Sequence, residues 1–353
     1  MEKIEISTSK TQNSEIIIEN EISKNIFDFA DEKRSFLITN STIAKLYGHL
    51  IYKFNKNRVI IIKDGEKYKN IKTFDFILNR LLEEKIERKD TIIALGGGVV
   101  GDLAGYVASS VLRGVNLIQV PTTLLAMCDS SIGGKTGFNS KFGKNLIGSF
   151  YPASKILIDP TFLLTLNEYE YKCGLGEIVK YAFIEKSCKN EKKYDLINFL
   201  KRNQKKDIKN EMPYIINACA NLKAGVVEKD LLEGNLRKIL NFGHTFAHPI
   251  ETLTNYKKVS HGEAVAYGMK YAAKLALNQK LIEKDYFDEI IFLIDKFELT
   301  KKKMKLNKKK FIELMGQDKK VENKKINLLL PVAHQEVALF DNIDLLSIEA
   351  CLP

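Results

Sequence analysis

The chain is 353 residues long, which exceeds what one ordinary hydrophobic core covers and predicts two domains. Hydrophobic residues make up 45% of it and charged residues 28%, which excludes a disordered chain and predicts a globular protein. The formal net charge of +11 is compatible with nucleic acid, an acidic membrane surface or a small anionic ligand as a partner.

The amino terminus lacks the features of a signal peptide. Residues 1–5 alternate charged and apolar side chains, without an apolar stretch or a small-residue cleavage site. No apolar run approaches the roughly 18 residues that a membrane span needs. We therefore expect a cytoplasmic protein with no membrane partner.

The cysteines argue against disulfides and a thiolate metal site, and the lysines argue against nucleic acid as a partner. The five cysteines are scattered and form no CxxC pair, which argues against a disulfide framework and against a thiolate metal site. The densest lysine run, residues 301–310, is followed by Phe311 but contains no stacking aromatic residue or nucleic-acid-reading motif. We interpret it as a solvated helical face and expect no nucleic-acid partner.

The first half of the chain alternates short β-branched runs with helical patterns, which predicts a mostly parallel sheet with covering helices. The expected strands are Ser35–Thr39, Arg58–Lys63, Thr91–Leu95, Asn116–Val120 and Lys155–Ile158. A helix is expected over Thr73–Asp90, where apolar residues recur at helical spacing. The Ile-rich alternation of Glu2–Glu19 predicts an edge hairpin.

After about residue 165, strand-like runs vanish and amphipathic stretches take over. We therefore expect an α/β domain over residues 1–165 and a mainly α-helical domain over residues 166–353. The expected helices include Asp195–Leu200, Glu211–Val227 and Glu263–Leu277. Lys325–Leu330 is β-like and is bounded by Pro331, so it is predicted as a lone strand or a hairpin within the second domain.

A glycine-rich turn directly follows the third expected strand. Gly96, Gly98 and Gly101 formally satisfy GxGxxG, whose glycines let backbone amides approach a pyrophosphate at a helix start. The ordinary dinucleotide fingerprint also has an acidic residue about twenty positions later, where this chain has Pro121-Thr122-Thr123. The run is therefore not an ordinary Rossmann fingerprint, and it predicts either a phosphate cradle or a tight turn with close helix packing.

A polar loop over Asp129–Gly137 is soon followed by Gly143-Lys144-Asn145. Lysine supplies a point charge and asparagine a neutral donor, so these segments suit an anionic, hydroxylated ligand. Because polar loop residues between apolar strands often carry function, we favour a ligand site over a solvated loop.

Three of the five histidines lie close together in sequence, at His244, His248 and His261. Residues 237–248 read as one helix, on which His244 and His248 share a face, as do Arg237, Asn241 and His248. Clustered histidines without cysteine pairs favour a zinc-like site, completed by a carboxylate, over histidines satisfied within the core.

The pattern alone leaves open which two histidines bind the ion. It also leaves open which carboxylate completes the site among Glu177, Glu233, Glu251 and Glu263.

Six ordered blocks of this sequence resemble the 3-dehydroquinate synthase family of sugar-phosphate cyclases. They are Gly96–Asp102, Pro121–Ala126, Asp129–Gly137, Gly176–Lys180, Asn241–Thr245 and His261–Val265. The resemblance runs from about residue 64 to residue 320. It implies an NAD-binding, mostly parallel-sheet domain followed by a mainly helical domain that binds metal and substrate.

The resemblance implies a carbon–oxygen lyase of the shikimate pathway, which leads to the aromatic amino acids. Such an enzyme converts 3-deoxy-D-arabino-heptulosonate 7-phosphate to 3-dehydroquinate and phosphate. It uses an NAD that is regenerated in each turnover and a divalent metal, here Zn²⁺ or Co²⁺. The alternatives are another sugar-phosphate cyclase or a metal-dependent polyol dehydrogenase.

The resemblance also implies roles for individual residues. The metal ligands fall on Glu177, His244 and His261. The substrate and catalytic set falls on Asp129, Lys135, Asn145, Lys180, Lys223, Glu233, Arg237, Asn241 and His248, with one lysine of Asp318-Lys319-Lys320 added. Arg113 would reach the site of the neighbouring subunit in a homodimer. The cofactor set falls on Glu66, Lys69, Gly98, Gly101, Asp102, Thr122, Thr123, Lys135, Lys144 and Thr165.

Three positions depart from the family pattern. Asn40 stands where an aspartate on the adenosine ribose is usual, so binding of that hydroxyl would weaken or rely on Glu66. Pro249 follows His248, and because proline disfavours an α conformation in the residue before it, we expect a bend there. Lys172–Gly176 is an unusual lead into Glu177.

Overall fold

The computed structural model describes residues 13–205, 207–255, 258–302, 304, 306–317, 321–322 and 325–353. The chain divides into two compact units. Unit 1 comprises the residues up to Pro121 together with Gly134–Asp159, and unit 2 comprises Thr122–Gly133 and Pro160–Pro353. The expected single boundary after residue 165 differs from this division, because Thr122–Gly133 belongs to the second unit.

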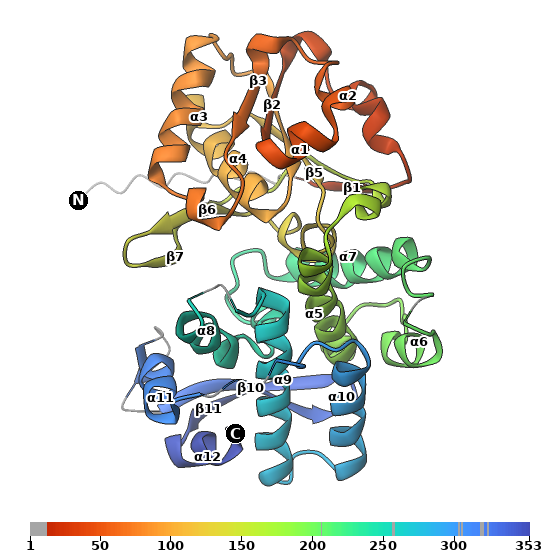
Figure 1. Cartoon of the computed structure of the whole chain (residues 1–353), viewed down its shortest axis with the longest axis vertical. Helices are drawn as coiled ribbons and strands as arrows, with labels where there is room; N and C mark the ends of the chain where they lie inside the picture. Colours follow the sequence, from red (N-terminus) through yellow and green to blue (C-terminus); the bar gives the residue numbers. More distant parts are fainter. Residues whose placement is uncertain are drawn as a thin grey trace, which may run out of the picture. The chain divides into compact units, whose positions relative to one another are not determined.

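A six-stranded sheet forms the centre of unit 1, in the order β1-β8-β5-β4-β2-β3, and each adjacent pair runs parallel (Figure 1). Its strands are β1 (Glu15–Ile18), β2 (Ser35–Asn40), β3 (Val59–Ile62), β4 (Thr91–Gly96), β5 (Asn116–Pro121) and β8 (Lys155–Ile158). β2 and β4 are buried along their whole length, as expected where helices cover a parallel sheet.

Four α-helices and a hairpin accompany the sheet in the described part of unit 1. They are α1 (Ser41–Leu46), α2 (Gly48–Ile51), α3 (Ile71–Glu83), α4 (Gly98–Ser110), and the antiparallel strands β6 (Lys135–Ser140) and β7 (Gly143–Phe150). Asn40 and Asn70 cap α1 and α3, because their side chains accept from amides of the first turn. α4 contacts both β4 and β6, so it links the sheet to the hairpin.

The sequence predicted five of the six strands of this sheet, all except β1, to within one residue at each end. The helix expected over Thr73–Asp90 ends earlier, at Glu83, where Lys85 adopts a left-handed backbone with φ of 55°. Within the edge hairpin predicted over Glu2–Glu19, the described strand β1 lies at the edge of the sheet and pairs in parallel with β8. Residues 1–12, the other half of that predicted hairpin, lie outside the described part of the chain.

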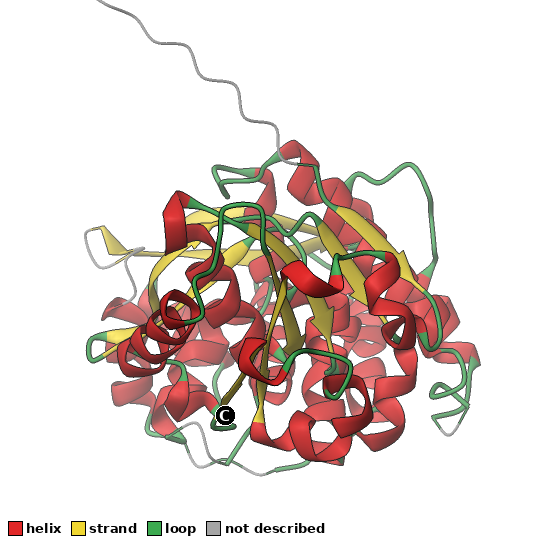
Figure 2. Cartoon of the chain, turned by 90° about the horizontal axis from the view of Figure 1, so that it is seen from above, coloured by secondary structure: helices red, strands yellow, loops and turns green. Residues whose placement is uncertain are grey.

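Unit 2 is mainly helical (Figures 1 and 2). Its helices are α5 (Glu168–Ile184), α6 (Leu196–Arg202), α7 (Met212–Lys229), α8 (His244–Leu253), α9 (His261–Asn278), α10 (Lys284–Lys296), α11 (Lys308–Gln317) and α12 (Leu345–Cys351). Its antiparallel sheet consists of β9 (Val321–Glu322), β10 (Lys325–Ala333) and β11 (Glu336–Ile343). The helices predicted over 195–200, 211–227 and 263–277 are confirmed as α6, α7 and α9.

The strand or hairpin predicted at Lys325–Leu330 is confirmed in its hairpin form, because β10 pairs antiparallel with β11. β10 continues through Pro331 to Ala333, and the proline lies beside a register shift, where it is tolerated. One expectation for unit 2 needs correction. The lysine run 301–310 is not one helical face, because α11 begins only at Lys308. None of the described helices has the length and apolarity that crossing a bilayer requires.

The hairpin β6–β7 predicts the outcome of a glycine substitution. A Cβ added at Gly148 would lie 2.1 Å from the carbonyl oxygen of Thr136, a backbone atom of the partner strand. Gly148→Ala should therefore cost roughly 1–3 kcal/mol of folding free energy, measured by urea unfolding. Gly316→Ala in α11 is the matched control, because nothing lies within 4 Å of the added carbon. Equal stability of the two variants would contradict this packing.

Candidate active site

Three side chains from three helices of unit 2 converge on one point. Glu177 lies within α5, while His244 and His261 are the first residues of α8 and α9. Oε1 of Glu177 lies 3.6 Å from Nε2 of His244 and 3.4 Å from Nε2 of His261. One potential ligand atom from each residue lies within 4.8 Å of the others. We call these residues the Glu177 triad.

The helix predicted over residues 237–248 is broken in the structure. Leu236–Asn241 forms a 3₁₀ turn, and α8 begins at His244 after Gly243, whose φ is 82°. A Cβ at Gly243 would also lie 2.8 Å from the carbonyl oxygen of Val265 in α9. The break makes His244 the first residue of a new helix that packs directly on α9. α8 then includes Pro249 and ends at Leu253.

The start of α9 is fixed by a capping box. Oγ of Ser260 accepts from the amide of Glu263 at 3.3 Å, and a carboxylate oxygen of Glu263 accepts from the amide of Ser260 at 2.8 Å. This reciprocal pair satisfies two amides at the helix start. It therefore sets His261 at the first position of the helix.

Glycines next to the triad let α5 and α9 approach each other closely. A Cβ at Gly176 would lie 2.3 Å from the carbonyl oxygen of Gly262, and one at Gly262 would lie 2.0 Å from that of Cys173. Only residues without side chains fit at these two positions. The close backbone contact explains the glycines in the lead to Glu177, and it places Glu177 and His261 opposite each other.

The triad fits a divalent metal ion. Glu177 is 1% exposed, and its Oε1 has no hydrogen-bond partner among the described residues. A buried, unpartnered carboxylate oxygen is costly unless a cation compensates it. Two imidazole nitrogens and one carboxylate oxygen form a donor set that zinc prefers, and three protein ligands leave positions open for catalysis.

The electrostatic surroundings differ between the two histidines. Burial lowers the pKa of His244 to about 3, which the negative charge of Glu177 opposes only in part. Burial would also lower the pKa of His261, but contacts with Glu177 and Glu251 outweigh it and raise the pKa to about 10. Burial would raise the pKa of Glu177, yet Lys180 and the histidines lower it to about 2. Without metal at neutral pH, the triad therefore holds a carboxylate, a neutral His244 and a protonated His261.

The structure separates the four carboxylates that the sequence left open. Glu177 faces both histidine Nε2 atoms, whereas Oε1 of Glu251 contacts Nδ1 of His261 at 3.3 Å. Glu263 belongs to the capping box of α9. Oε1 of Glu233 accepts from Nδ2 of Asn241 at 2.7 Å. Glu177 alone among the four faces the Nε2 atoms of both histidines.

A cluster of buried charges continues from the triad. Nζ of Lys180 contacts Oε2 of Glu177, and both side chains are 1% exposed. Asp129 forms an ion pair with Nζ of Lys223 at 3.0 Å and accepts a hydrogen bond from the hydroxyl of Tyr181 at 2.7 Å. Burial would raise the pKa of Asp129, but Lys223 and then Lys180 hold it well below its usual range. Lys180 thus places a positive charge beside the triad and Lys223 places one beside Asp129, in a setting suited to an anion.

Arg237 and its neighbours form the next part of the site. Arg237 is 1% exposed, and its Nη2 donates to the carbonyl oxygen of Gly133 at 2.9 Å. A Cβ at Gly133 would lie 2.6 Å from that nitrogen, so glycine is needed for the contact. His248 is exposed on α8, with its ring centroid 6.1 Å from that of His244. The polar residues of this part therefore come from the 3₁₀ turn and from α8, not from one helical face.

In unit 1, a polar network joins residues of the cofactor set to a substrate residue. Nζ of Lys69, which is 5% exposed, donates to a carboxylate oxygen of Asp102 and to Oδ1 of Asn145 at 2.6 Å. The amide of Asn145 donates to Oδ1 of Asn139, whose Nδ2 donates to Glu66 at 2.7 Å. Four of the predicted residues therefore form one connected network through Asn139.

The glycine-rich turn connects β4 to α4, with Gly97 as the N-cap and Gly98 as the first helical residue. A Cβ at Gly101 would lie 2.8 Å from Oε1 of Gln119, so this glycine packs α4 against β5. In unit 2, Thr122 is 3% exposed, and its hydroxyl has no partner among the described residues. Thr122 thus offers an unused hydroxyl, whereas Gly101 is explained by packing.

Asn40, one of the departures from the family pattern, has a defined role in the structure. Its Oδ1 caps α1, and its Nδ2 donates to Oδ1 of Asp64 at 3.0 Å. The other oxygen of Asp64 accepts from the hydroxyl of Thr42 at 2.6 Å. Asn40 ends β2, and Asp64 lies two residues after the end of the adjacent strand β3, so a carboxylate is still present at this edge of the sheet.

The remaining predicted site residues lie in both units or outside the described part of the chain. Lys135 and Arg113 are exposed in unit 1, and Lys144 is half-buried on β7. Arg113 and the preceding Leu112 both have positive φ, 63° and 49°, an unusual backbone for consecutive non-glycine residues. In unit 2, hydroxyls of two predicted threonines make local contacts: Thr123 with the amide of Ala126, and Thr165 with the carbonyl of Phe162. Lys319 and Lys320 lie outside the described residues.

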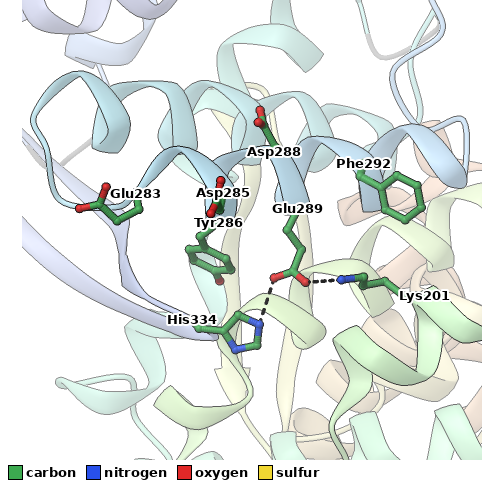
Figure 3. A pocket seen from close by; sticks show the side chains of 8 residues that line it. All are labelled: Lys201, Glu283, Asp285, Tyr286, Asp288, Glu289, Phe292 and His334. Atoms are coloured by element: carbon green, nitrogen blue, oxygen red, sulfur yellow. Dashed lines mark hydrogen bonds and ion pairs between the residues drawn. The ribbon is translucent and has the colours of Figure 1, made fainter.

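A large surface cavity elsewhere in unit 2 is lined by other residues than the candidate metal ligands and the buried lysines. Its volume is about 710 Å³. On its wall, the carboxylate of Glu289 lies 2.7 Å from Nζ of Lys201 and 3.0 Å from Nε2 of His334 (Figure 3). Glu289 is therefore already compensated by protein groups. The cavity contains no member of the triad or of the buried lysine cluster.

Comparison with known proteins shows the family of the chain. Residues 59–173 match the family model for the N-terminal part of 3-dehydroquinate synthase, and residues 174–321 match that for its C-terminal part. The chain belongs to the 3-dehydroquinate synthase family. The 3-dehydroquinate synthase of Campylobacter fetus subsp. fetus is 41% identical over 337 residues, which cover 92% of this chain and 94% of that protein. That of Helicobacter pylori is 41% identical over 305 residues, 85% of each chain.

Solved structures of related cyclases share the fold. A 2-epi-5-epi-valiolone synthase from Streptomyces hygroscopicus subsp. jinggangensis 5008, solved with NAD⁺ and Zn²⁺, has a TM-score of 0.87 at 22% identity and covers 99% of this chain and 98% of that one. A 2-deoxy-scyllo-inosose synthase, solved with carbaglucose-6-phosphate, NAD⁺ and Co²⁺, has a TM-score of 0.83 at 24% identity, with 95% of each chain covered. The predicted fold class, a mostly parallel sheet domain and a mainly helical domain, is confirmed.

Sequence reasoning missed two contacts of the site. Tyr181 is fully buried and donates to Asp129, yet a tyrosine beside Lys180 on a helix carries no signal of that partner. Glu251 was considered as a metal ligand, but its contact is with the far nitrogen of His261. Its spacing of seven residues from His244, two helical turns, was the available signal that it faces the same side of α8.

The pKa values of the triad predict how metal binding depends on pH. An ion must displace the proton of His261, so affinity for Zn²⁺ should rise about tenfold per pH unit below pH 10. Chelator competition between pH 6 and 8.5 measures this slope, and calorimetry in two buffers measures the release of about one proton. The pKa of His261 is higher in the folded protein, at about 10, than in the unfolded chain, at about 6.5. The protonated ring therefore adds fully to the free energy of unfolding of the metal-free protein below pH 6.5, and this contribution declines as the pH rises toward 10. Affinity that does not change with pH would contradict this assignment.

Proposed function

We propose that this protein is a 3-dehydroquinate synthase. It converts 3-deoxy-D-arabino-heptulosonate 7-phosphate to 3-dehydroquinate and phosphate, with a catalytic NAD and a divalent metal. The proposal is supported by family membership along most of the chain. The observation that carries it is the Glu177 triad, with its unpartnered carboxylate oxygen, next to two buried lysines.

Glu177, His244 and His261 would hold the metal. When bound, Zn²⁺ or Co²⁺ would supply Lewis-acid polarisation of a substrate alcohol, which makes its oxidation by NAD easier. The substrate carries a carboxylate and a phosphate, and the positive charges of Lys180, Lys223 and Arg237 suit these anions. The other residues proposed for substrate are Asp129, Lys135, Asn145, Glu233, Asn241 and His248.

The cofactor role is proposed for residues of both units. The residues are Glu66, Lys69, Gly98, Gly101, Asp102, Thr122, Thr123, Lys135, Lys144 and Thr165. The network of Lys69 supports this role, because it fixes polar groups near the end of the glycine-rich turn before any ligand binds. The unused hydroxyl of Thr122 supports it as well, since a ligand group would satisfy it.

The half-buried carboxylate of Asp129 is a poor base. Lys223 and Tyr181 both engage it, and its pKa is held below the usual range. We therefore infer that the leaving phosphate removes the adjacent proton itself, while Asp129 orients Lys223. The role of the protein in that step is to bind the phosphate and to exclude a competing carboxylate base.

Turnover without accumulation of reduced cofactor tests the proposed function. Purified protein loaded with zinc and NAD should release phosphate from 3-deoxy-D-arabino-heptulosonate 7-phosphate with no net NADH, because the ketone is reduced again. His261→Ala is the matched control and should lower this rate by more than about a hundredfold. Accumulation of NADH would indicate a polyol dehydrogenase. Faster phosphate release from a hexose 6-phosphate or from a heptulose 7-phosphate without a carboxylate would indicate another cyclase.

Arg113 provides a test of the proposed homodimer with shared sites. If Arg113 serves the neighbouring site, Arg113→Ala and His261→Ala are each inactive, yet a mixed dimer contains one site with both residues intact. Random exchange of subunits should restore about a quarter of wild-type activity. Each variant mixed with itself is the control. Full activity of Arg113→Ala, or no recovery after exchange has been verified, would remove the shared site.

A further inference from the structure

Glu251 is a buried carboxylate that the proposed metal ligands do not include. It is 6% exposed and lies on α8, with its Oε1 3.3 Å from Nδ1 of His261. The other nitrogen of that ring, Nε2, lies 3.4 Å from Oε1 of Glu177. His261 is therefore held between two carboxylates, one at each ring nitrogen.

The contact determines which nitrogen of His261 can bind a cation. A neutral imidazole has one N–H donor and one lone pair. When an ion held by Glu177 displaces the proton from Nε2, the carboxylate of Glu251 holds the remaining proton on Nδ1, and the lone pair of Nε2 is left for the ion. His244 has the same arrangement, with Nδ1 3.2 Å from the carbonyl oxygen of Phe242. The two rings thus present the same nitrogen, but only His261 has a charged partner behind it.

Positive charges near the triad oppose the binding of a cation, and a second carboxylate counteracts them. α8 and α9 begin at His244 and His261, so the positive ends of two helix dipoles lie at the site. Lys180 contacts Oε2 of Glu177 and offsets much of its charge. A divalent cation would therefore face little net negative charge from Glu177, and Glu251 supplies another negative charge from the far side of His261.

We propose that Glu251 is a positioning residue for the metal site: it orients His261 through Nδ1 and adds the negative charge that a divalent ion requires there. This inference rests on the proposed role of the Glu177 triad as metal ligands. Groups behind metal-bound histidines typically change metal affinity by about 10–100-fold. Glu251 should act on affinity in this way without being a ligand itself.

Two substitutions separate orientation from charge. Glu251→Gln keeps an oxygen that accepts from Nδ1 but removes the charge, whereas Glu251→Ala removes both. We expect affinity for Co²⁺, measured by chelator competition at several pH values and corrected for the proton that the ion displaces from His261, to fall from wild type to Gln to Ala, with a total loss of about 10–100-fold. The visible absorption of bound Co²⁺ should keep the intensity that reports its coordination number, and NAD affinity should stay unchanged.

Glu185→Gln is the matched control. Glu185 is also 6% exposed and belongs to unit 2, but its oxygens accept from the backbone amides of Tyr194 at 2.6 Å and of Leu196 at 2.8 Å. This variant should lower the melting temperature of the metal-free protein and leave Co²⁺ affinity unchanged. The Glu251 variants should instead lose more Co²⁺ affinity than any change in their melting temperature accounts for.

Four results would overturn the inference. They are unchanged Co²⁺ affinity in Glu251→Ala, a loss of affinity that only parallels a loss of thermal stability, a changed coordination number, and a wild-type protein that binds no Co²⁺. The third would make Glu251 a ligand. A wild-type protein that binds Co²⁺ without turnover would remove only the proposed reaction, because the variant series still measures the effect on affinity.

Discussion

The site depends on one buried carboxylate whose two oxygens have different partners. Oε2 of Glu177 contacts Lys180, while Oε1 faces the Nε2 atoms of His244 and His261 without a hydrogen bond. A carboxylate that is 1% exposed is stable only if its charge is compensated. Lys180 contacts one oxygen, and in the metal-free protein the protonated His261 faces the other at 3.4 Å. A metal ion that displaces the proton of His261 takes over this compensation, so metal binding and the charge of the triad are linked.

Backbone packing makes this arrangement possible. Gly176 and Gly262 bring α5 and α9 so close that any side chain at either position would overlap backbone atoms. The break at Gly243 and the capping box of α9 place the two histidines at helix starts. Such short, unhydrated contacts between helices leave little freedom of adjustment. The ligand atoms are thus brought together before an ion binds, which reduces the cost of organising the site.

Charged side chains of both signs surround the triad. Glu251 lies behind His261, Lys180 lies behind Glu177, and Asp129 is held by Lys223 and Tyr181. Each buried charge has an opposite charge or a polar hydrogen next to it, as burial in a low dielectric requires. The lysines carry the positive charge that an anionic substrate needs, and the carboxylates retain the negative charge that a divalent ion needs.

The sequence determined the parallel strands and long helices, because β-branched runs and helical periodicity reflect local burial. It also determined the chemical types at the site, through clustered histidines, glycine turns and ordered family blocks. Only the tertiary structure decided that residues 237–248 break at Gly243 and that β10 extends past Pro331. It also brings Glu177, the carboxylate that the family resemblance implied, opposite both histidines. These features depend on contacts between residues far apart in the chain, such as Gly243 with Val265, which local sequence patterns do not encode.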